Sequence, residues 1–223
     1  MLKALAAAVL LGIGLAGCAN NPAIDRLELS ASAAKPARVG SVYMLRGIFG
    51  ISGGIDEVAA ELNGLGVRAS VHDHSDWFAV AETIKAQYKA EPEHEPIILV
   101  GFSMGGNDVI QLSRQLALDG IPVDLLVMLD PTIPPSVPTN VARAVELYQT
   151  QAGFRGVPVQ ADPGFRGELI VRNLDDLPGI EHHDLPVRPE VRREVVERVL
   201  QVARPRAAQP KQHMVEQRRG QRG

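Results

Sequence analysis

Cysteine is nearly absent from the chain, since Cys18 is the only one among 223 residues. A single thiol cannot close an intramolecular disulfide, so oxidising surroundings would add no covalent cross-link. An excess of positive charge is also lacking: 23 Lys and Arg residues stand against 26 Asp and Glu residues, which gives a formal net charge of −3. This balance provides no general attraction to nucleic acid, and we therefore expect no nucleic-acid partner.

Long hydrophobic runs are missing as well. The apolar stretch from Ala4 to Leu15 follows the positive Lys3 and is too short to span a bilayer comfortably. It ends in Leu15-Ala16-Gly17-Cys18, which resembles the bacterial lipobox. The resemblance implies a lipoprotein signal peptide over residues 1–17, with acyl chains such as palmitate on Cys18. An ordinary secretory leader or an N-terminal anchor helix is the alternative.

The two ends of the chain frame one domain. Lipid on Cys18 would anchor the protein through several buried acyl chains. In Gram-negative lipoproteins an aspartate after the cysteine commonly marks inner-membrane retention, whereas Ala19 stands here. We therefore expect an outer-membrane protein of the bacterial envelope that faces the periplasm. Residues 18–38 are predicted to be a flexible tether, residues 39–203 a single domain and residues 204–223 a disordered basic tail.

Within the domain, short apolar runs alternate with amphipathic helix patterns. Strands are expected at residues 41–45, 67–72, 97–100, 123–129 and 168–172. Helices are expected at residues 55–65, 77–88, 104–116 and 189–203, and a helical piece around residues 141–148 within a short lid at residues 131–167. The strands are almost continuously apolar, which is typical of a parallel sheet covered on both faces. The pattern predicts an α/β fold with a mostly parallel, doubly wound sheet of five or six strands flanked by helices.

One stretch joins a strand to a helix through a serine. The run Gly101-Phe102-Ser103-Met104-Gly105 is a G-x-S-x-G sequence between an apolar strand and an amphipathic helix. In that context the pattern predicts a nucleophile elbow, in which a strained turn lifts the serine hydroxyl above the sheet. Glycine is needed on either side because larger side chains there would collide with the strand and the helix.

The elbow, an aspartate at a strand end and a late histidine together resemble an α/β-hydrolase. The sequence Val127-Met128-Leu129-Asp130-Pro131, following the elbow, is similar to the thioesterase domains of peptide and polyketide synthases. The likeness covers about residues 39–203 in a reduced form of the fold. It implies cleavage of an ester or thioester through an acyl-enzyme, with a small-molecule acyl substrate and no cofactor.

A serine nucleophile needs an imidazole base and a carboxylate that orients it. The family order of serine, acid and histidine is met. Asp130 is the preferred acid because the strand at residues 168–172 must deliver the histidine, while Asp175 and Asp176 are the alternative. His182 is the preferred base, on the resemblance, and His183 remains the alternative. Adjacent histidines rarely converge on one ion, so no metal is expected.

The tetrahedral intermediate requires backbone N–H donors. The Met104 N–H at the helix start is the first candidate, and the Ile48 N–H after the first strand is the second. Many members of the resembling family have a histidine before Gly47, where this chain has Arg46. That arginine is expected to pair with a surface acid or to contact an anionic group of the substrate.

The sequence thus predicts a lipid-anchored serine hydrolase of the cell envelope. The alternative hypothesis is a non-catalytic lipoprotein that binds a ligand on the same scaffold, because a fold alone does not establish activity.

Overall fold

The computed structural model describes residues 38–151 and 156–206. The predicted signal peptide, Cys18, nearly all of the tether and most of the basic tail lie outside the described residues. Among the helices of the described segments, none combines the length and the hydropathy needed to cross a bilayer.

Six parallel strands form one sheet in the order β2-β1-β3-β4-β5-β6. The strands are β1 Ser41–Leu45, β2 Arg68–His72, β3 Ile97–Phe102, β4 Leu125–Leu129, β5 Arg143–Tyr148 and β6 Glu168–Asn173. The sheet confirms the predicted doubly wound α/β architecture, with six strands.

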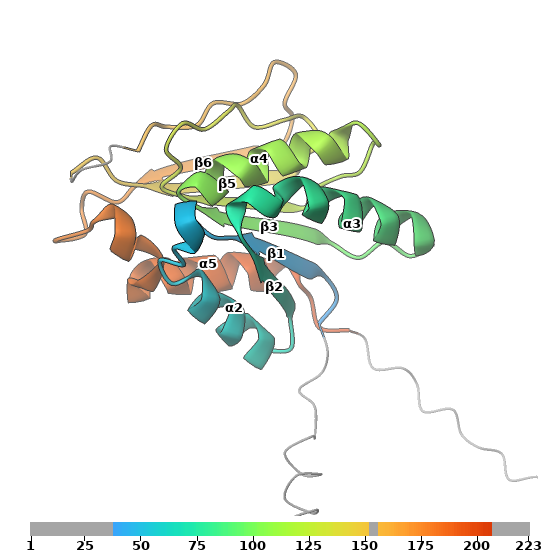
Figure 1. Cartoon of the computed structure of the whole chain (residues 1–223), viewed down its shortest axis with the longest axis horizontal. Helices are drawn as coiled ribbons and strands as arrows, with labels where there is room; N and C mark the ends of the chain where they lie inside the picture. The colour runs from blue at the N-terminus through green and yellow to red at the C-terminus, as the bar shows by residue number, and fades with distance from the viewer. Residues whose placement is uncertain (1–37, 152–155, 207–223) are drawn as a thin grey trace, which may run out of the picture. The chain divides into compact units, whose positions relative to one another are not determined.

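Helices cover both faces of the sheet. They are α2 Ile55–Gly64, α3 Trp77–Ala90, α4 Met104–Ala117 and α5 Pro189–Val202, with short 3₁₀ turns η1 Ile48–Gly50, η2 His74–Asp76 and η3 His182–Val187. Figure 1 shows α3 and α4 on one side of the sheet and α2 and α5 on the other. Every residue of β3 and β4 is buried as a result, which explains why these strands read as unbroken apolar runs.

The helical piece predicted around residues 141–148 is wrong, because Arg143–Tyr148 is strand β5. Its side chains alternate between the two apolar layers: Val145 and Leu147 join the core beneath α2 and α5, whereas Ala144 joins the core beneath α3 and α4. Because both faces of this short strand are buried, apolar side chains occur on both. The alternation of apolar and polar residues that normally distinguishes a strand from a helix is therefore not visible in the sequence.

The winding of the sheet reverses direction at β1. From β1 the chain passes through α2 to β2 on one side, and then through α3 to β3 on the other side. In such sheets, ligand sites lie beyond the carboxyl ends of the strands where the winding reverses. We therefore expect a ligand site among the segments that follow β1, β3 and the neighbouring strand β4.

Candidate active site

Ser103 occupies a strained turn between β3 and α4. Its backbone has φ 57° and ψ −120°, and its N–H donates to the carbonyl of Leu129 over 2.9 Å. A Cβ on Gly101 would lie 2.1 Å from the carbonyl oxygen of Gly105, and a Cβ on Gly105 would lie 2.4 Å from the carbonyl oxygen of Leu45. The two glycines thus allow the start of α4 to press against the ends of β3 and β1, as a nucleophile elbow requires.

Three polar side chains far apart in the sequence meet at this turn. The Ser103 Oγ lies 2.9 Å from His182 Nε2, and His182 Nδ1 lies 2.7 Å from Asp130 Oδ2. In the tautomer whose Nδ1–H donates to the carboxylate, Nε2 accepts from the serine hydroxyl. Ser103 and Asp130 are buried, and the His182 side chain is only 13% exposed. The structure therefore aligns a serine, an imidazole and a carboxylate in hydrogen-bonded sequence.

The Asp130 carboxylate is held from the side of β5. Asp130 follows β4 with φ 45°, and its N–H donates to the carbonyl of Leu147. The backbone N–H of Gln149 donates to Asp130 Oδ1, and the buried Gln149 side-chain amide donates to Oδ2 over 3.0 Å. Gly156 passes so close that a Cβ there would lie 2.4 Å from Asp130 Oδ1. These contacts fix the carboxylate plane toward His182.

The sequence reasoning missed both Gln149 and Gly156. Gln149 comes immediately after β5, a segment for which the sequence pattern predicts a helical piece. Once β5 is placed next to β4, the polar residue after its end falls beside Asp130, because neighbouring parallel strands end at one edge of the sheet.

The alternative acids lie elsewhere. Asp175 accepts from the backbone N–H of Thr150 over 2.8 Å and from its hydroxyl, and these bonds hold the pKa of Asp175 below its usual range. Asp176 is exposed. Asp175 thus anchors the segment just after Gln149, while Asp130 is the carboxylate in contact with the imidazole.

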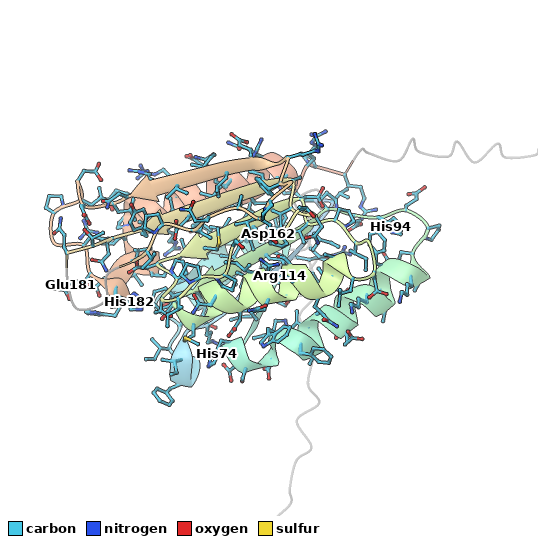
Figure 2. All side chains as sticks on the ribbon, turned by 90° about the horizontal axis from the view of Figure 1, so that it is seen from above. His74, His94, Arg114, Asp162, Glu181 and His182 are labelled. Atoms are coloured by element: carbon cyan, nitrogen blue, oxygen red, sulfur yellow. The ribbon has the colours of Figure 1, made fainter. Side chains whose placement is uncertain are left out.

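The two adjacent histidines have different surroundings. His182 begins η3, and its ring lies 5.1 Å from the ring of Phe102, the last residue of β3. The His183 side chain is 68% exposed and lies beside the carboxylates of Glu181 and Asp184. Figure 2 shows His182 and Glu181 at one end of the sheet, with His94 at the opposite end. The structure therefore brings His182, and not His183, to the serine.

Backbone donors lie beside the serine on two sides. Met104 is the first residue of α4, and the first N–H groups of a helix have no partner within the helix. Gly47 precedes Ile48, and a Cβ on Gly47 would lie 3.4 Å from the Cβ of Ser103. The segment that carries the Ile48 N–H thus passes close to Ser103, and the role of Met104 and Ile48 as oxyanion donors stays a prediction.

Arg46 pairs with two acids at the start of that segment. Its guanidinium contacts Asp56 Oδ1 at 2.7 Å and Asp73 Oδ1 at 3.0 Å. The hydrogen bond that the Arg46 guanidinium donates to Asp56 holds the pKa of that carboxyl below its usual range. Of the two expected roles for Arg46, the structure favours pairing with surface acids, which ties the β1–α2 loop to its neighbours.

A second carboxyl group is buried near Asp130. Glu146 on β5 has no exposed surface, and its Oε2 accepts the Val159 N–H over 2.8 Å. Its Oε1 has no hydrogen-bond partner within the part of the chain that the structure describes. Burial raises the pKa of Glu146 to about 7, and the negative charge of Asp130 acts in the same direction. Glu146 therefore joins β5 to the segment that contains Gly156 and Val159.

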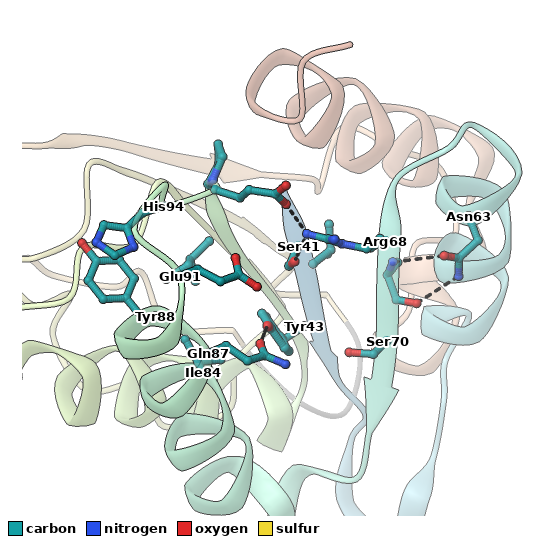
Figure 3. A pocket seen from close by; sticks show the side chains of 15 residues that line it. Ser41, Tyr43, Asn63, Arg68, Ser70, Ile84, Gln87, Tyr88, Glu91 and His94 are labelled. Carbon is teal, nitrogen blue, oxygen red and sulfur yellow. Dashed lines mark hydrogen bonds and ion pairs between the residues drawn. The ribbon is translucent and has the colours of Figure 1, made fainter. Parts of the chain in front are cut away.

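A cavity of about 410 Å³ opens at the other end of the sheet, where β1 and β2 begin (Figure 3). Its polar side chains largely satisfy one another: the Tyr43 hydroxyl donates to Gln87, the rings of Tyr88 and His94 stack, and Arg68 pairs with Glu95. None of the residues that line it belongs to the site around Ser103.

Comparisons with known proteins give only distant similarities. No family model matches the sequence, and no curated protein matches it. Among solved structures, the chain is similar to the NocB thioesterase domain of the nocardicin cluster, with 16% identity, 74% of this chain and 94% of that chain covered, and a TM-score of 0.48. The type II thioesterase BorB of the borrelidin cluster is 13% identical to this chain, with 76% of this chain and 95% of that chain covered and a TM-score of 0.48. A protein from Xanthomonas campestris pv. campestris, described as a hydrolase of the alpha/beta superfamily, is 14% identical to this chain. The similarity covers 74% of this chain and 99% of that chain, with a TM-score of 0.48. Because these TM-scores fall below 0.5, function is not transferred from these structures.

Proposed function

We propose that the protein is a serine hydrolase that cleaves a carboxylic ester or thioester through an acyl-enzyme intermediate. One observation carries the proposal: His182 makes a 2.9 Å contact to the Ser103 hydroxyl through one ring nitrogen and a 2.7 Å contact to Asp130 through the other. This is the geometry that turns a weakly nucleophilic hydroxyl into a reactive one. It supports hydrolysis over the non-catalytic binding function, for which no aligned proton acceptor beside a strained serine is needed.

In the first half of the reaction the Ser103 Oγ attacks the acyl carbon, and His182 Nε2 takes the hydroxyl proton. Asp130 stabilises the imidazolium cation that forms. The Met104 and Ile48 N–H groups donate to the oxyanion, a contact whose loss costs about 10²–10³ in rate in well-studied hydrolases. When the intermediate collapses, the alcohol or thiol leaves with the proton from His182 and the acyl group stays on Ser103.

In the second half a water molecule loses its proton to His182 Nε2 and attacks the acyl-enzyme. Collapse of this second intermediate breaks the ester bond to Ser103, and His182 returns the proton to the serine oxygen. The acid product departs and the starting state is restored. No metal or cofactor is part of the proposed cycle.

Labelling with a serine-directed fluorophosphonate tests this function on the full-length protein. We expect a covalent adduct with the wild-type chain and none with Ser103→Ala. The chain offers a matched control, because the Ser70 Oγ lies 2.9 Å from His72 Nε2 on the edge strand β2. Ser70→Ala should label like the wild type. An unlabelled wild-type protein of native circular dichroism, or labelling that survives Ser103→Ala, would refute the proposal.

We also propose that the protein is anchored in the bacterial envelope through lipid on Cys18, in the outer membrane and facing the periplasm. The support is the run Leu15-Ala16-Gly17-Cys18 after a short apolar stretch, followed by Ala19. An envelope location weighs against acyl-coenzyme A, a cytoplasmic metabolite, as substrate. In a Gram-negative host fed radiolabelled palmitate, label should enter the wild-type protein and be lost in Cys18→Ser. Equal incorporation, or none in either, contradicts the anchor.

A further inference from the structure

Exposed apolar side chains gather around one edge of the protein. Nine large hydrophobic residues are exposed among those that the structure describes, and six of them belong to four segments that surround Ser103. The six are Ile48, Phe49, Ile51, Ile133, Val157 and Val187. Single exposed apolar residues are ordinary on a protein surface, whereas a concentration of them indicates a site of interaction. We call these six residues the apolar collar.

The β1–α2 segment of the collar is packed against the end of β3. In this segment, a Cβ on Gly53 would lie 2.5 Å from the ring of Phe102, the residue before the nucleophile. On the same segment, Gly54 abuts Val187, so the segment after His182 joins it directly. Phe49 stands at the outermost part with φ 56°, an unfavourable conformation for an aromatic residue, and its side chain is 90% exposed.

The other collar segments are attached on the opposite side of the serine. The Ile133 N–H donates to Asn107 Oδ1 on α4, and the Thr132 hydroxyl accepts from the same Asn107 side chain. Val157 follows Gly156, which lies against Asp130. Each collar segment is thus attached to residues next to the candidate active site or to α4. The exposed apolar side chains of these segments lie around that site.

The collar segments also lack charge. Residues 47–54, 131–140, 156–160 and 185–187 contain no Asp, Glu, Lys or Arg, although 22% of the chain is charged. Charged side chains are the ones that resist transfer from water to an apolar phase, because their desolvation is costly. These four stretches can enter such a phase without this cost, while the exposed carboxylates of Asp73 and Asp184 lie just outside them.

We infer that the collar docks on the surface of a lipid bilayer, so that the enzyme draws acyl ester substrates directly from the lipid–water interface. Phe49 and Ile133 are 90% and 83% exposed, so they project outward instead of lining a groove where one acyl chain would cover them. A planar apolar phase covers projecting side chains on all sides at once. The docked orientation turns the side of the protein that carries the collar and Ser103 toward the membrane. The substrate class, an ester of a lipid acyl chain, rests on the proposed hydrolase function, whereas the docking itself does not.

Tryptophan reporters test the docking in the full-length protein. Phe49→Trp places a reporter on the collar. Leu118→Trp places one at a site that is 79% exposed at the far end of α4, about 20 Å along the helix axis from the elbow. Both variants keep the native Trp77, and any anchor at Cys18 acts on both alike. With phosphatidylcholine vesicles that carry brominated acyl chains, we expect a blue shift and strong quenching for Phe49→Trp and little change for Leu118→Trp. Equal quenching of the two reporters, or none at either, overturns the docking.

Kinetics supply a second readout. The ratio of the hydrolysis rate on p-nitrophenyl palmitate in vesicles to that on soluble p-nitrophenyl acetate is measured for wild type and for the double variant Phe49→Ser, Ile133→Ser. Loss of two inserted apolar side chains should lower this ratio about tenfold or more. An unchanged ratio contradicts the inference, as does activity that depends on a protein acyl carrier and ignores vesicles. If both rates are zero in the wild type, the hydrolase proposal fails, while the fluorescence result still decides the docking.

Discussion

Glu146→Gln is expected to remove much of the dependence of the protein's stability on pH between about 4.5 and 7. Glu146 is fully buried on β5, accepts the Val159 N–H, and lies within the influence of the Asp130 charge. Burial raises its pKa from an ordinary value of 4.5 to about 7. The glutamine amide oxygen can accept the same N–H bond, but the side chain cannot ionise.

The sign follows from proton counting. Between pH 4.5 and 7 the unfolded chain has released the Glu146 proton while the folded protein still holds it, so the free energy of unfolding falls as pH rises. The stabilisation is fully present below about pH 4.5 and is lost by about pH 7. A shift from 4.5 to about 7 corresponds to roughly 3 kcal/mol at 1.36 kcal/mol per pH unit. In Glu146→Gln the side chain cannot ionise, so this fall in the free energy of unfolding with rising pH does not occur.

Thermal unfolding followed by circular dichroism at pH 4.5 and pH 8 measures the effect. The buried glutamine N–H groups add a cost that does not depend on pH, so the relevant quantity is the change in the Tm difference between variant and wild type. We expect that difference to move in favour of the variant by about 6–12 °C from the lower to the higher pH. Glu168→Gln on the neighbouring strand β6, at an exposed position, is the matched control and should show little movement. Parallel pH profiles for wild type and Glu146→Gln would show that Glu146 holds no proton in the folded state.

Three further predictions concern the site itself. Asp130→Asn should lower the esterase rate by about 10⁴, because the amide no longer holds the productive imidazole tautomer; a loss under tenfold would remove Asp130 from the mechanism. His182→Ala should abolish fluorophosphonate labelling while His183→Ala stays within about twofold of wild type, and the reverse pattern would show that the other imidazole is the base. Gly101→Ala should prevent folding or depress the Tm strongly, since the added Cβ would lie 2.1 Å from the Gly105 carbonyl oxygen; a native Tm measured by circular dichroism would contradict the elbow geometry.

Local pattern in the sequence was sufficient for most of the fold. Strands β1, β3 and β4 were predictable because buried parallel strands are continuous apolar runs, and the helices after them carry one apolar face. The elbow was predictable for the same reason: Gly101 and Gly105 flank a serine at a change from strand to helix, and steric constraint on a turn is a local property.

Contacts between distant segments were not accessible in this way. Choosing between His182 and His183 depends on the direction in which each side chain leaves η3, and one residue of difference turns an imidazole from Ser103 to solvent. Gln149 carries no local signal either. Gln149 lies beside Asp130 only because β5 pairs with β4. The sequence pattern did not reveal this pairing, because it predicted a helix where β5 lies.

Strand β5 is therefore the element on which the proposed chemistry depends most, although it contributes no reacting group. Backbone bonds continue past the strand ends: the Ser103 N–H donates to the last residue of β4, and the Asp130 N–H donates to Leu147 of β5. Gln149, just after β5, orients the Asp130 carboxylate, and Glu146 within β5 holds the segment that presses Gly156 against it. Ser103 is thus positioned by β4, the strand that leads to Asp130, and Asp130 is positioned by β5. In such a site, each loop that follows a strand is held in place by the loop next to it. These contacts explain how a small sheet of six strands can hold both Ser103 and Asp130 at positive φ within one hydrogen-bonded group.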